Sequence, residues 1–350
     1  MVNWIKRYMR LVVANVFSIM FVIICFASCH EVEEWENTPK GNFDALWTVL
    51  DEHYCFFEEK GVNWDAMYLK YSSKAKNVLT EEELFLVCAE MLDELKDGHT
   101  NLSSPFNTSY YRKWWSDYPQ NYDARLIQEY YFNFNYRSLN DIDYGILPEN
   151  IGYIHYGSFV YGLGEGNIDH ILAYLATCES LIIDVRNNGG GNLTNVEPLV
   201  RRFITEPILA GYISHKTGPG HDDFSEPFAY YYNPADKGHI MWGKPIVVLT
   251  NRSTYSAANN FVSVMKNLPN VTIVGATTGG GCGMPFSSEL PCGWAVRFSA
   301  CPMYDANGNL TEMGVEPTEG CTVDMNLADE LSGHDTILDF AIEYLTKSMQ

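Results

Sequence analysis

The chain has 350 residues, of which 46% are hydrophobic and 19% charged, so it can form one large or two moderate domains with a real core. Its formal net charge is −21, and the first 28 residues carry Lys6, Arg7 and Arg10 without an acid, which leaves −24 on residues 29–350. Such an acidic surface repels phosphate backbones, and we therefore expect no nucleic-acid partner.

The N-terminus has the layout of a secretory signal peptide. An apolar run over 11–26 follows the basic start, and the small residues Ala27 and Ser28 stand directly before Cys29. This ending resembles the lipobox of bacterial lipoproteins, so we expect residues 1–28 to be a signal peptide and Cys29 to carry lipid. The protein would then be anchored to the outer membrane of the cell envelope, on its periplasmic or surface face. The alternative is a plain signal anchor, for which the apolar run is short.

An acidic tether over 29–41 is expected to lead into a helical domain over 42–100. Apolar residues recur at three- and four-residue spacing in three stretches, which are 42–60, 62–78 and 79–95. In the third stretch Thr80 precedes Glu83 by three residues, which is the arrangement of a capping box.

The segment 101–150 is rich in aromatic residues and has no clean helical period. Aromatic alternation over 130–136 suggests strands. This connecting segment could line a peptide groove, although packing of aromatic side chains in a core is the commoner use of such residues.

Strands and helices alternate from 151 to 350. The strands are predicted at 151–159, 181–185, 208–216, 246–250 and 271–275, and the helices between them at 167–178, 196–204 and 255–268. This alternation predicts an open α/β sheet with helices on its faces, in a chain that is α/β overall with α+β mixing. Ligands of such sheets bind beyond the carboxyl ends of the strands, where the loops 187–192, 251–255 and 277–283 fall.

Ser256 lies where the strand 246–250 gives way to the helix 255–268. Free backbone N–H groups and the positive end of the helix dipole can stabilise an oxyanion at such a junction, which favours a nucleophilic serine. The simpler interpretation is a helix N-cap. A nucleophile would also need a base, an acceptor that orients the base, and oxyanion donors.

His99, in the sequence DGHT, is the best candidate base, because the glycine before it and the hydroxyl after it suggest a turn that presents the ring. His155 and His215 are rivals that more simply serve packing or lie on the surface.

Three consecutive glycines follow the strand 181–185. Such a run lets backbone N–H groups turn toward one point, so Gly189 or Gly190 could supply one oxyanion donor and Ala257 the second. The simpler reading of these glycines is a tight turn.

We expect neither a metal nor a cofactor, because CxxC, HExxH, Walker and GxSxG motifs are absent and His221, Asp222 and Asp223 fit a solvated loop. Seven of the nine cysteines remain after Cys25 and the lipidated residue are set aside. Cys282 and Cys292 could pair in an oxidising envelope, and free buried thiols are the alternative.

Six segments, in this order, resemble the C-terminal processing (tail-specific) peptidase family over roughly residue 42 to the C-terminus; they are DGHTNL, IGYIHYGSF, LIIDVRNNGGGN, IVVLTNRSTYSAANNF, TIVGATTGGG and EMGVEP. One branch of that family uses a lysine base in a downstream glycine-rich loop, but position 281 is glycine here. The branch of the tricorn core protease and the retinoid-binding protein repeats takes its base from a histidine in an N-terminal helical domain, and His99 looks like that histidine. The resemblance implies a helical domain followed by an open sheet of the ClpP/crotonase-like type.

The resemblance also implies site residues. Ser256 would attack a peptide carbonyl, His99 would transfer the proton, and the amides of Gly190 and Ala257 would receive the oxyanion. Glu312, in TEMGVEP, would hold the imidazole.

Two positions qualify that assignment. Glu316 is the rival for the glutamate. In the tricorn protease the glutamate acts through a serine that precedes the histidine, and Gly98 stands at that place in this chain.

The segment 101–150 is too short for the PDZ module common in the family, so the groove itself would grip the substrate, with Trp114, Trp115 and Tyr118 as candidates. We therefore expect a serine-type peptidase that cleaves peptides or protein C-terminal tails. The alternative is a catalytically decayed surface lipoprotein that binds a peptide or a small apolar ligand on the same scaffold. No sequence feature specifies an oligomeric state.

Overall fold

The computed structural model describes residues 35–348, and Asn37–Gln350 form one compact unit. The expected signal peptide over 1–28, the lipidation site Cys29 and the first part of the tether lie outside the described residues. No helix in the described range is long and apolar enough to cross a membrane.

The helical region of the described chain contains α2 (Pro39–His53), α3 (Phe57–Lys60), α4 (Trp64–Lys76) and α5 (Glu81–Asp93). The stretch expected as one helix over 42–60 is two, because Tyr54 takes an extended conformation (φ −71°, ψ 139°) and ends α2. The α5 cap is close to the predicted box: the Thr80 hydroxyl accepts from the Glu83 amide at 3.2 Å, while the Glu83 carboxylate accepts from the Leu79 amide at 2.7 Å.

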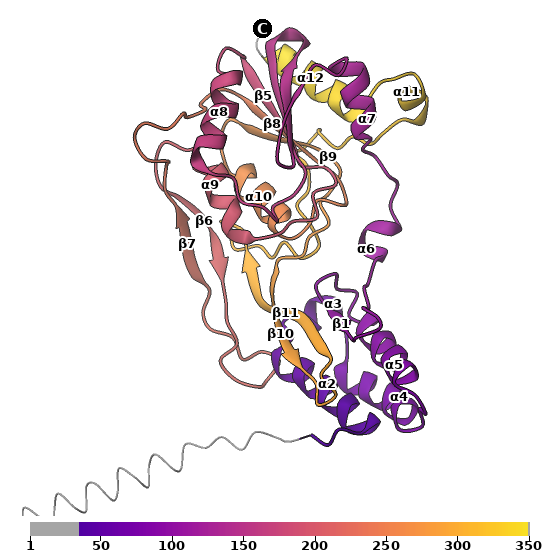
Figure 1. The fold of residues 1–350 in the computed structure, drawn as a ribbon. Coiled ribbons are helices and arrows are strands. Elements are labelled where there is room, and N and C mark those ends of the chain that lie inside the picture. The colour runs from indigo at the N-terminus through magenta and orange to yellow at the C-terminus, as the bar shows by residue number, and fades with distance from the viewer. Residues whose placement is uncertain (1–34, 349–350) are drawn as a thin grey trace, which may run out of the picture. The chain divides into compact units, whose positions relative to one another are not determined.

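A six-stranded sheet forms the centre of the α/β region (Figure 1). Its strands, in spatial order, are β2 (Arg137–Leu139), β3 (Ile142–Leu147), β4 (Ile151–Tyr156), β5 (Ser180–Asp184), β8 (Ile246–Thr250) and β9 (Val271–Gly275). β4, β5, β8 and β9 are parallel, whereas β2 and β3 join antiparallel at one edge. The mixed α/β fold is thus confirmed.

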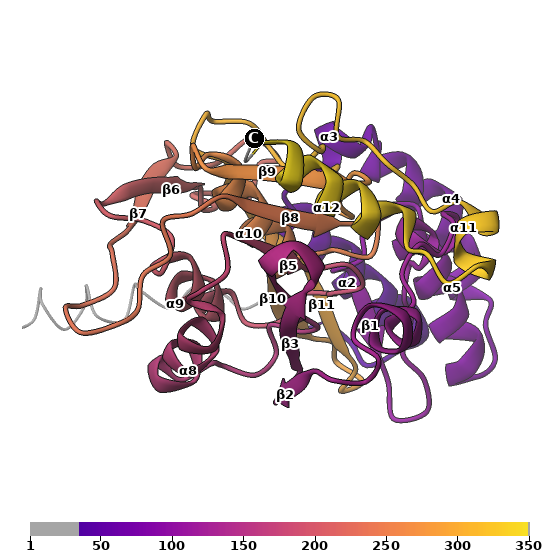
Figure 2. The same cartoon turned by 90° about the horizontal axis from the view of Figure 1, so that it is seen from above.

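Helices cover both faces of this sheet. One face packs against α8 (Glu165–Leu175), α9 (Val196–Val200) and α10 (Ala257–Lys266), and the other against α12 (Thr336–Ser348), as Figure 2 shows from above. Side chains of the central strands alternate accordingly: Ile183 and Val248 belong to the first core, and Ile182 and Val247 to the second.

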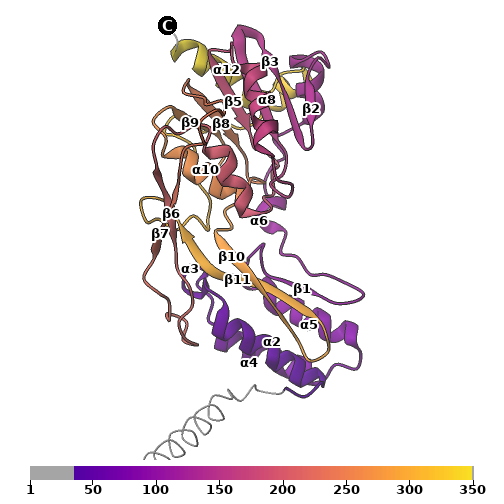
Figure 3. The same ribbon diagram turned by 60° about the vertical axis from the view of Figure 1, so that its left-hand side comes forward.

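The strand expected at 208–216 does not join the main sheet. It is β6 (Ile208–Ile213), and it pairs antiparallel with β7 (Phe228–Tyr232) and with β11 (Ala295–Tyr304). β10 (Gly283–Glu289) and β1 (Asn101–Ser103) pair with the other part of β11. The long strand β11 therefore runs from the helical region to the α/β region (Figure 3).

The aromatic alternation over 130–136 does not form strands. Ile127–Tyr131 is a π-helical turn, and the rings of Phe132 and Tyr136 pack 6.2 Å apart beside the core. The remaining short elements are α6 (Lys113–Ser116), α7 (Ala124–Leu126), η2 (Pro148–Asn150), η3 (Leu193–Asn195) and α11 (Leu327–Leu331).

A fully buried ion cluster fixes the end of β5. The Arg186 guanidinium donates to the Asp184 carboxylate at 2.6 Å and to Asp335 at 2.9 Å, and the Tyr153 hydroxyl also donates to Asp184. Because every charge has an opposite partner, the cluster can be buried, and it holds the start of the glycine loop that follows β5.

Candidate active site

Ser256 occupies the N-cap position of α10 but does not act as a cap, because its side chain makes no capping hydrogen bond. Its hydroxyl Oγ lies 2.9 Å from Nε2 of His99. The backbone of Ser256 is at φ 57° and ψ −121°, a conformation that costs a non-glycine residue about 1–3 kcal/mol and is found mainly at functional sites. The structure thus favours the nucleophile over the cap.

His99 comes from the turn between α5 and β1, where the Asp97 carboxylate accepts from the His99 amide at 2.8 Å. The imidazole is only 4% exposed, and burial lowers the pKa of His99 to about 4, against the opposing charge of Asp97. The ring is therefore neutral at neutral pH. Within the described residues Nδ1 has no hydrogen-bond partner. The charge of Asp97, and after it the backbone of Gly283, act to raise the imidazole pKa, but burial outweighs both.

Glu312 makes no hydrogen bond to the imidazole within the described residues, contrary to the role expected from the sequence. Its Oε1 accepts from the Lys60 ammonium at 2.7 Å and its Oε2 from the Cys282 amide at 3.0 Å. Gly98 offers no hydroxyl that could bridge the carboxylate to His99. Burial, followed by the charge of Asp97, raises the pKa of Glu312 to about 7.

The rival Glu316 is exposed, and only its carbonyl oxygen is bound, by Lys266 at 2.8 Å. The structure therefore places Glu312, and not Glu316, in the buried cluster next to the His99 turn.

Lys60 is a component of the site that sequence reasoning missed. Its ammonium contacts Glu312 and also donates to the carbonyl of Lys96, at 3.3 Å, in the turn that carries His99. Burial disfavours the ammonium, but Glu312 and Asp97 keep the pKa of Lys60 above its usual value. Burial also opposes ionisation of Asp97, yet the charge of Lys60 and the hydrogen bond from the His99 amide lower the pKa of that carboxyl. One ammonium between two carboxylates thus supports the turn.

The amide of Ala257, in the first turn of α10, has no acceptor among the described residues and is free to bind an oxyanion. The expected partner donor needs a correction. The Gly190 amide donates to Asn188 Oδ1 at 2.9 Å, so it is already engaged, whereas the Gly189 amide has no acceptor in the described part of the chain.

Gly190 still has a steric role. A Cβ there would stand 2.8 Å from the Cβ of Ser256 and 2.9 Å from the Ala257 nitrogen, so only glycine fits beside the nucleophile.

Tyr255 explains two positions at which this chain departs from the family pattern. Its ring stacks on Trp114 with 4.0 Å between centroids and lies 4.9 Å from the ring of His99. A Cβ at Gly98 would stand 2.8 Å from the Tyr255 hydroxyl, and a Cβ at Gly281 would stand 2.3 Å from its ring. The tyrosine therefore fills the space that a serine at 98 or a lysine at 281 would need.

Two cavities meet at Ser256. The first, of about 230 Å³, has both apolar and polar side chains around it. The apolar ones are Leu193, Ala257, Met284, Pro285 and Met303, and the polar ones besides the Ser256–His99 pair are Asn192, Asn260, Arg297 and Thr311. The second, of about 440 Å³, is lined by the glycines 189–191, Val160 and Trp114. Of the three aromatic residues expected in a groove, only Trp114 lines these cavities; Trp115 is half-buried and Tyr118 exposed elsewhere.

The two rival histidines serve packing. The ring of His155 stacks on Tyr122 with 4.8 Å between centroids, and Nδ1 of His215 lies 3.3 Å from the Cys301 sulfur.

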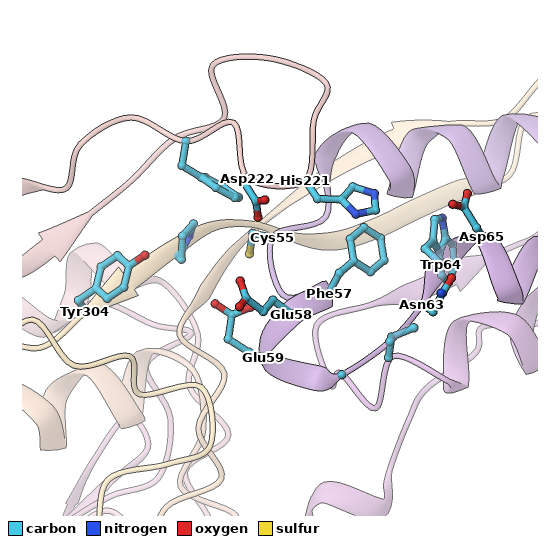
Figure 4. A pocket seen from close by; sticks show the side chains of 14 residues that line it. Cys55, Phe57, Glu58, Glu59, Asn63, Trp64, Asp65, His221, Asp222 and Tyr304 are labelled. Atoms are coloured by element: carbon cyan, nitrogen blue, oxygen red, sulfur yellow. The ribbon is translucent and has the colours of Figure 1, made fainter.

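A third cavity, of about 710 Å³, lies beside α3 and does not include the site residues (Figure 4). His221 stands at its edge over the ring of Phe57 and pairs with Asp51 at 2.8 Å. In residues 35–348 no three metal-ligating side chains converge. Cys282 and Cys292, which could have paired, are both free thiols.

Comparisons with known proteins agree with this geometry. The family description Peptidase family S41 matches residues 150–320, and the Tricorn protease C1 domain matches 35–93. A solved structure from Parabacteroides merdae, of a protein provisionally assigned as a peptidase, is 46% identical, with a TM-score of 0.83 over 89% of this chain and 97% of that one.

Two named proteases match over shorter stretches. The tail-specific protease of Haemophilus influenzae is 28% identical over 193 residues, which are 52% of this chain and 25% of that protein. The carboxy-terminal processing protease CtpB of Bacillus subtilis is 26% identical over 141 residues, 40% of this chain and 27% of that protein. The chain thus spans about a quarter of the length of these curated relatives.

Proposed function

This chain belongs to peptidase family S41, and we propose that it is a serine peptidase that hydrolyses peptide bonds by acyl transfer. The observation that carries the proposal is the 2.9 Å contact between His99 Nε2 and Ser256 Oγ, which joins a buried neutral imidazole to a serine in a strained conformation. A serine that is held this way gains nucleophilicity, because the imidazole can take its proton as the Oγ–carbon bond forms.

The reaction follows from these positions. Ser256 Oγ attacks the carbonyl carbon, and His99 accepts the hydroxyl proton. The amides of Ala257 and Gly189 receive the oxyanion. His99 then gives its proton to the leaving amine as the carbon–nitrogen bond breaks, and a water molecule hydrolyses the acyl-enzyme by the same proton path. Lys60 and Glu312 do not touch the reacting atoms in this scheme; they support the turn that carries His99.

The cavity beside Ser256 suggests the substrate class. Its apolar part, formed by Leu193, Met284 and Met303, favours an apolar side chain before the scissile bond. Cleavage of C-terminal tails, which the names of two relatives state of those proteins, is part of the proposal for this chain.

Reaction with a fluorophosphonate probe tests the proposal. The folded protein should be labelled on Ser256, as identified by mass spectrometry of the modified peptide, and the Ser256→Ala protein should not. A Ser256 that stays silent in folded protein would instead favour the decayed binding protein, in which the groove captures a peptide or a small apolar ligand without cleavage.

The pH dependence of labelling should report the environment of His99. Only the neutral imidazole accepts the serine proton, so the labelling rate should be constant at neutral pH and fall as the pH drops through about 4, where burial places the pKa of His99. Circular dichroism at each pH would verify that the protein stays folded. An inflection near 6.5, the ordinary value for histidine, would contradict this environment.

We also propose that residues 1–28 are a lipoprotein signal and that Cys29 is lipidated, which would place the peptidase in the cell envelope on the outer membrane. The support is the basic, apolar and small-residue order before the cysteine. Cells fed an alkyne-tagged fatty acid should incorporate the tag into this protein and into a Cys25→Ser control, but not into Cys29→Ser. Equal labelling of both variants would contradict the lipidation site.

A further inference from the structure

Arg297 stands in an unusual place for a cation in this acidic chain. It lies on β11, opposite Asn101 of β1 and Ser287 of β10, and its side chain is exposed. It lines both of the cavities that meet at Ser256. No other lysine or arginine, and no carboxylate, lines either cavity within the described residues. The candidate active site thus presents one positive charge to whatever enters it.

The guanidinium of Arg297 forms no ion pair or hydrogen bond with any of residues 35–348. Glu289, which shares the same face of β10 as Ser287, does not pair with it either. Two arginines elsewhere are occupied, since Arg202 pairs with Asp169 and Arg252 donates to the Trp114 carbonyl at 2.7 Å. Arg297 is therefore available to bind an anion from outside the chain.

The position of the imidazole tells which part of a substrate would meet this charge. In acyl transfer by a serine, the imidazole protonates the leaving amine, so the leaving segment passes over His99. Arg297 lines the same two cavities as His99 and is close enough that its charge contributes to the low pKa of His99. A leaving segment that passes over His99 would therefore also meet the guanidinium.

We propose, on the basis of the proposed peptidase function, that Arg297 binds a carboxylate in the leaving segment of the substrate, directly after the scissile bond. The planar guanidinium suits this ligand, because it can donate two parallel N–H···O bonds to one carboxylate. The carboxylate has two sources with the same chemistry. It is either the free C-terminus, when the last residue is removed, or the side chain of an aspartate or glutamate.

Four fluorescein-labelled hexapeptides separate these sources. All have leucine as the fifth residue, and they end in alanine as the free acid, alanine amide, aspartate amide or asparagine amide. If Arg297 binds the C-terminus, the wild-type kcat/KM should be about 10- to 100-fold higher for the alanine free acid than for the alanine amide. If it binds a side chain, the same ratio is expected between the aspartate amide and the asparagine amide.

The variants then test the residue. Arg297→Gln should bring the preferred ratio to about 1, and Arg297→Lys should keep part of it, because lysine supplies the charge without the planar fork. Arg125→Gln, at an arginine whose side chain is 81% exposed and pairs only with Glu129, is the control and should leave the ratio unchanged. Equal ratios in wild type and Arg297→Gln for both peptide pairs would overturn the proposal.

A binding measurement keeps this inference separate from the proposed function. The Ser256→Ala protein should bind the preferred carboxylate peptide more tightly than its uncharged counterpart by fluorescence anisotropy, and the added Arg297→Gln change should remove the difference. If the wild-type protein hydrolyses no peptide and stays unlabelled by the fluorophosphonate, the peptidase function fails, and this binding difference still decides whether Arg297 recognises a carboxylate.

Discussion

Ser256→Ala should lower the kcat for peptide hydrolysis by about 10⁶-fold, which is the size of effect expected when the nucleophile of a serine–histidine unit is removed. Among residues 35–348 the hydroxyl is the only hydrogen-bond partner of His99 Nε2, at 2.9 Å, so its loss leaves no alternative nucleophile there. The fold should remain, because the Ser256 side chain makes no capping bond to α10. Steady-state kinetics with a thermal unfolding curve would measure both effects.

His99→Gln and the double variant provide an internal check. Since the two side chains act as a unit, each single change should cost about as much as both together. Ser253→Ala, in the same loop but without a side-chain partner among the described residues, should keep full activity. Additive losses in the double variant would mean that Ser256 and His99 contribute independently, which the proposed mechanism does not allow.

Lys60→Met should lower the free energy of unfolding by about 3–5 kcal/mol, because it leaves buried carboxylates without their cation. The side chains of Lys60 and Glu312 are 8% and 2% exposed, so solvent cannot compensate. The folded-state pKa of Glu312 is already raised to about 7, above its unfolded value near 4.5. Its ionisation therefore disfavours the native state as the pH rises, and the loss should be larger at pH 8 than at pH 5 in urea titrations.

Two further variants show whether the loss of stability in Lys60→Met comes from the unpaired charge. Lys74→Met removes a lysine that is 49% exposed and pairs with Glu90 at 3.1 Å, and it should change stability by less than about 1 kcal/mol. Adding Glu312→Gln to Lys60→Met should restore part of the stability, because the unpaired charge is gone. If the double variant is no more stable than Lys60→Met alone, the loss arises from packing and not from charge.

The sequence alone predicts those site residues that can be recognised from the residues next to them in the chain. Ser256 follows a buried strand and precedes a helix, and the DGHT turn follows an amphipathic helix, so each could be found from its own neighbourhood. Their contact joins residues 157 positions apart, and only the resemblance to a family suggested it. The central parallel strands were predictable for the same reason, since each is a short apolar run with a turn on either side.

The predictions that were wrong failed because of contacts that the local sequence does not reveal. β6 looks like a strand of the main sheet, but it pairs with β7, the next strand along the chain, and with the distant β11, and this pairing places it in the second sheet. The partner of Glu312 was missed because Lys60 ends a helix of four residues that carries no motif. The Gly190 amide was expected to be free, and only the structure shows that the Asn188 side chain folds back to occupy it.

The ring of Tyr255 restricts how this chain can diverge. A lysine at 281 would overlap that ring and would also require a side chain at φ 76°, a backbone conformation that favours glycine. Removing the ring first would leave an empty space beside His99 before any lysine could replace it. Replacement of the histidine base by a lysine base therefore needs coordinated changes at positions 255 and 281. We expect descendants of this chain to stay with the histidine, or to lose activity before they gain the lysine.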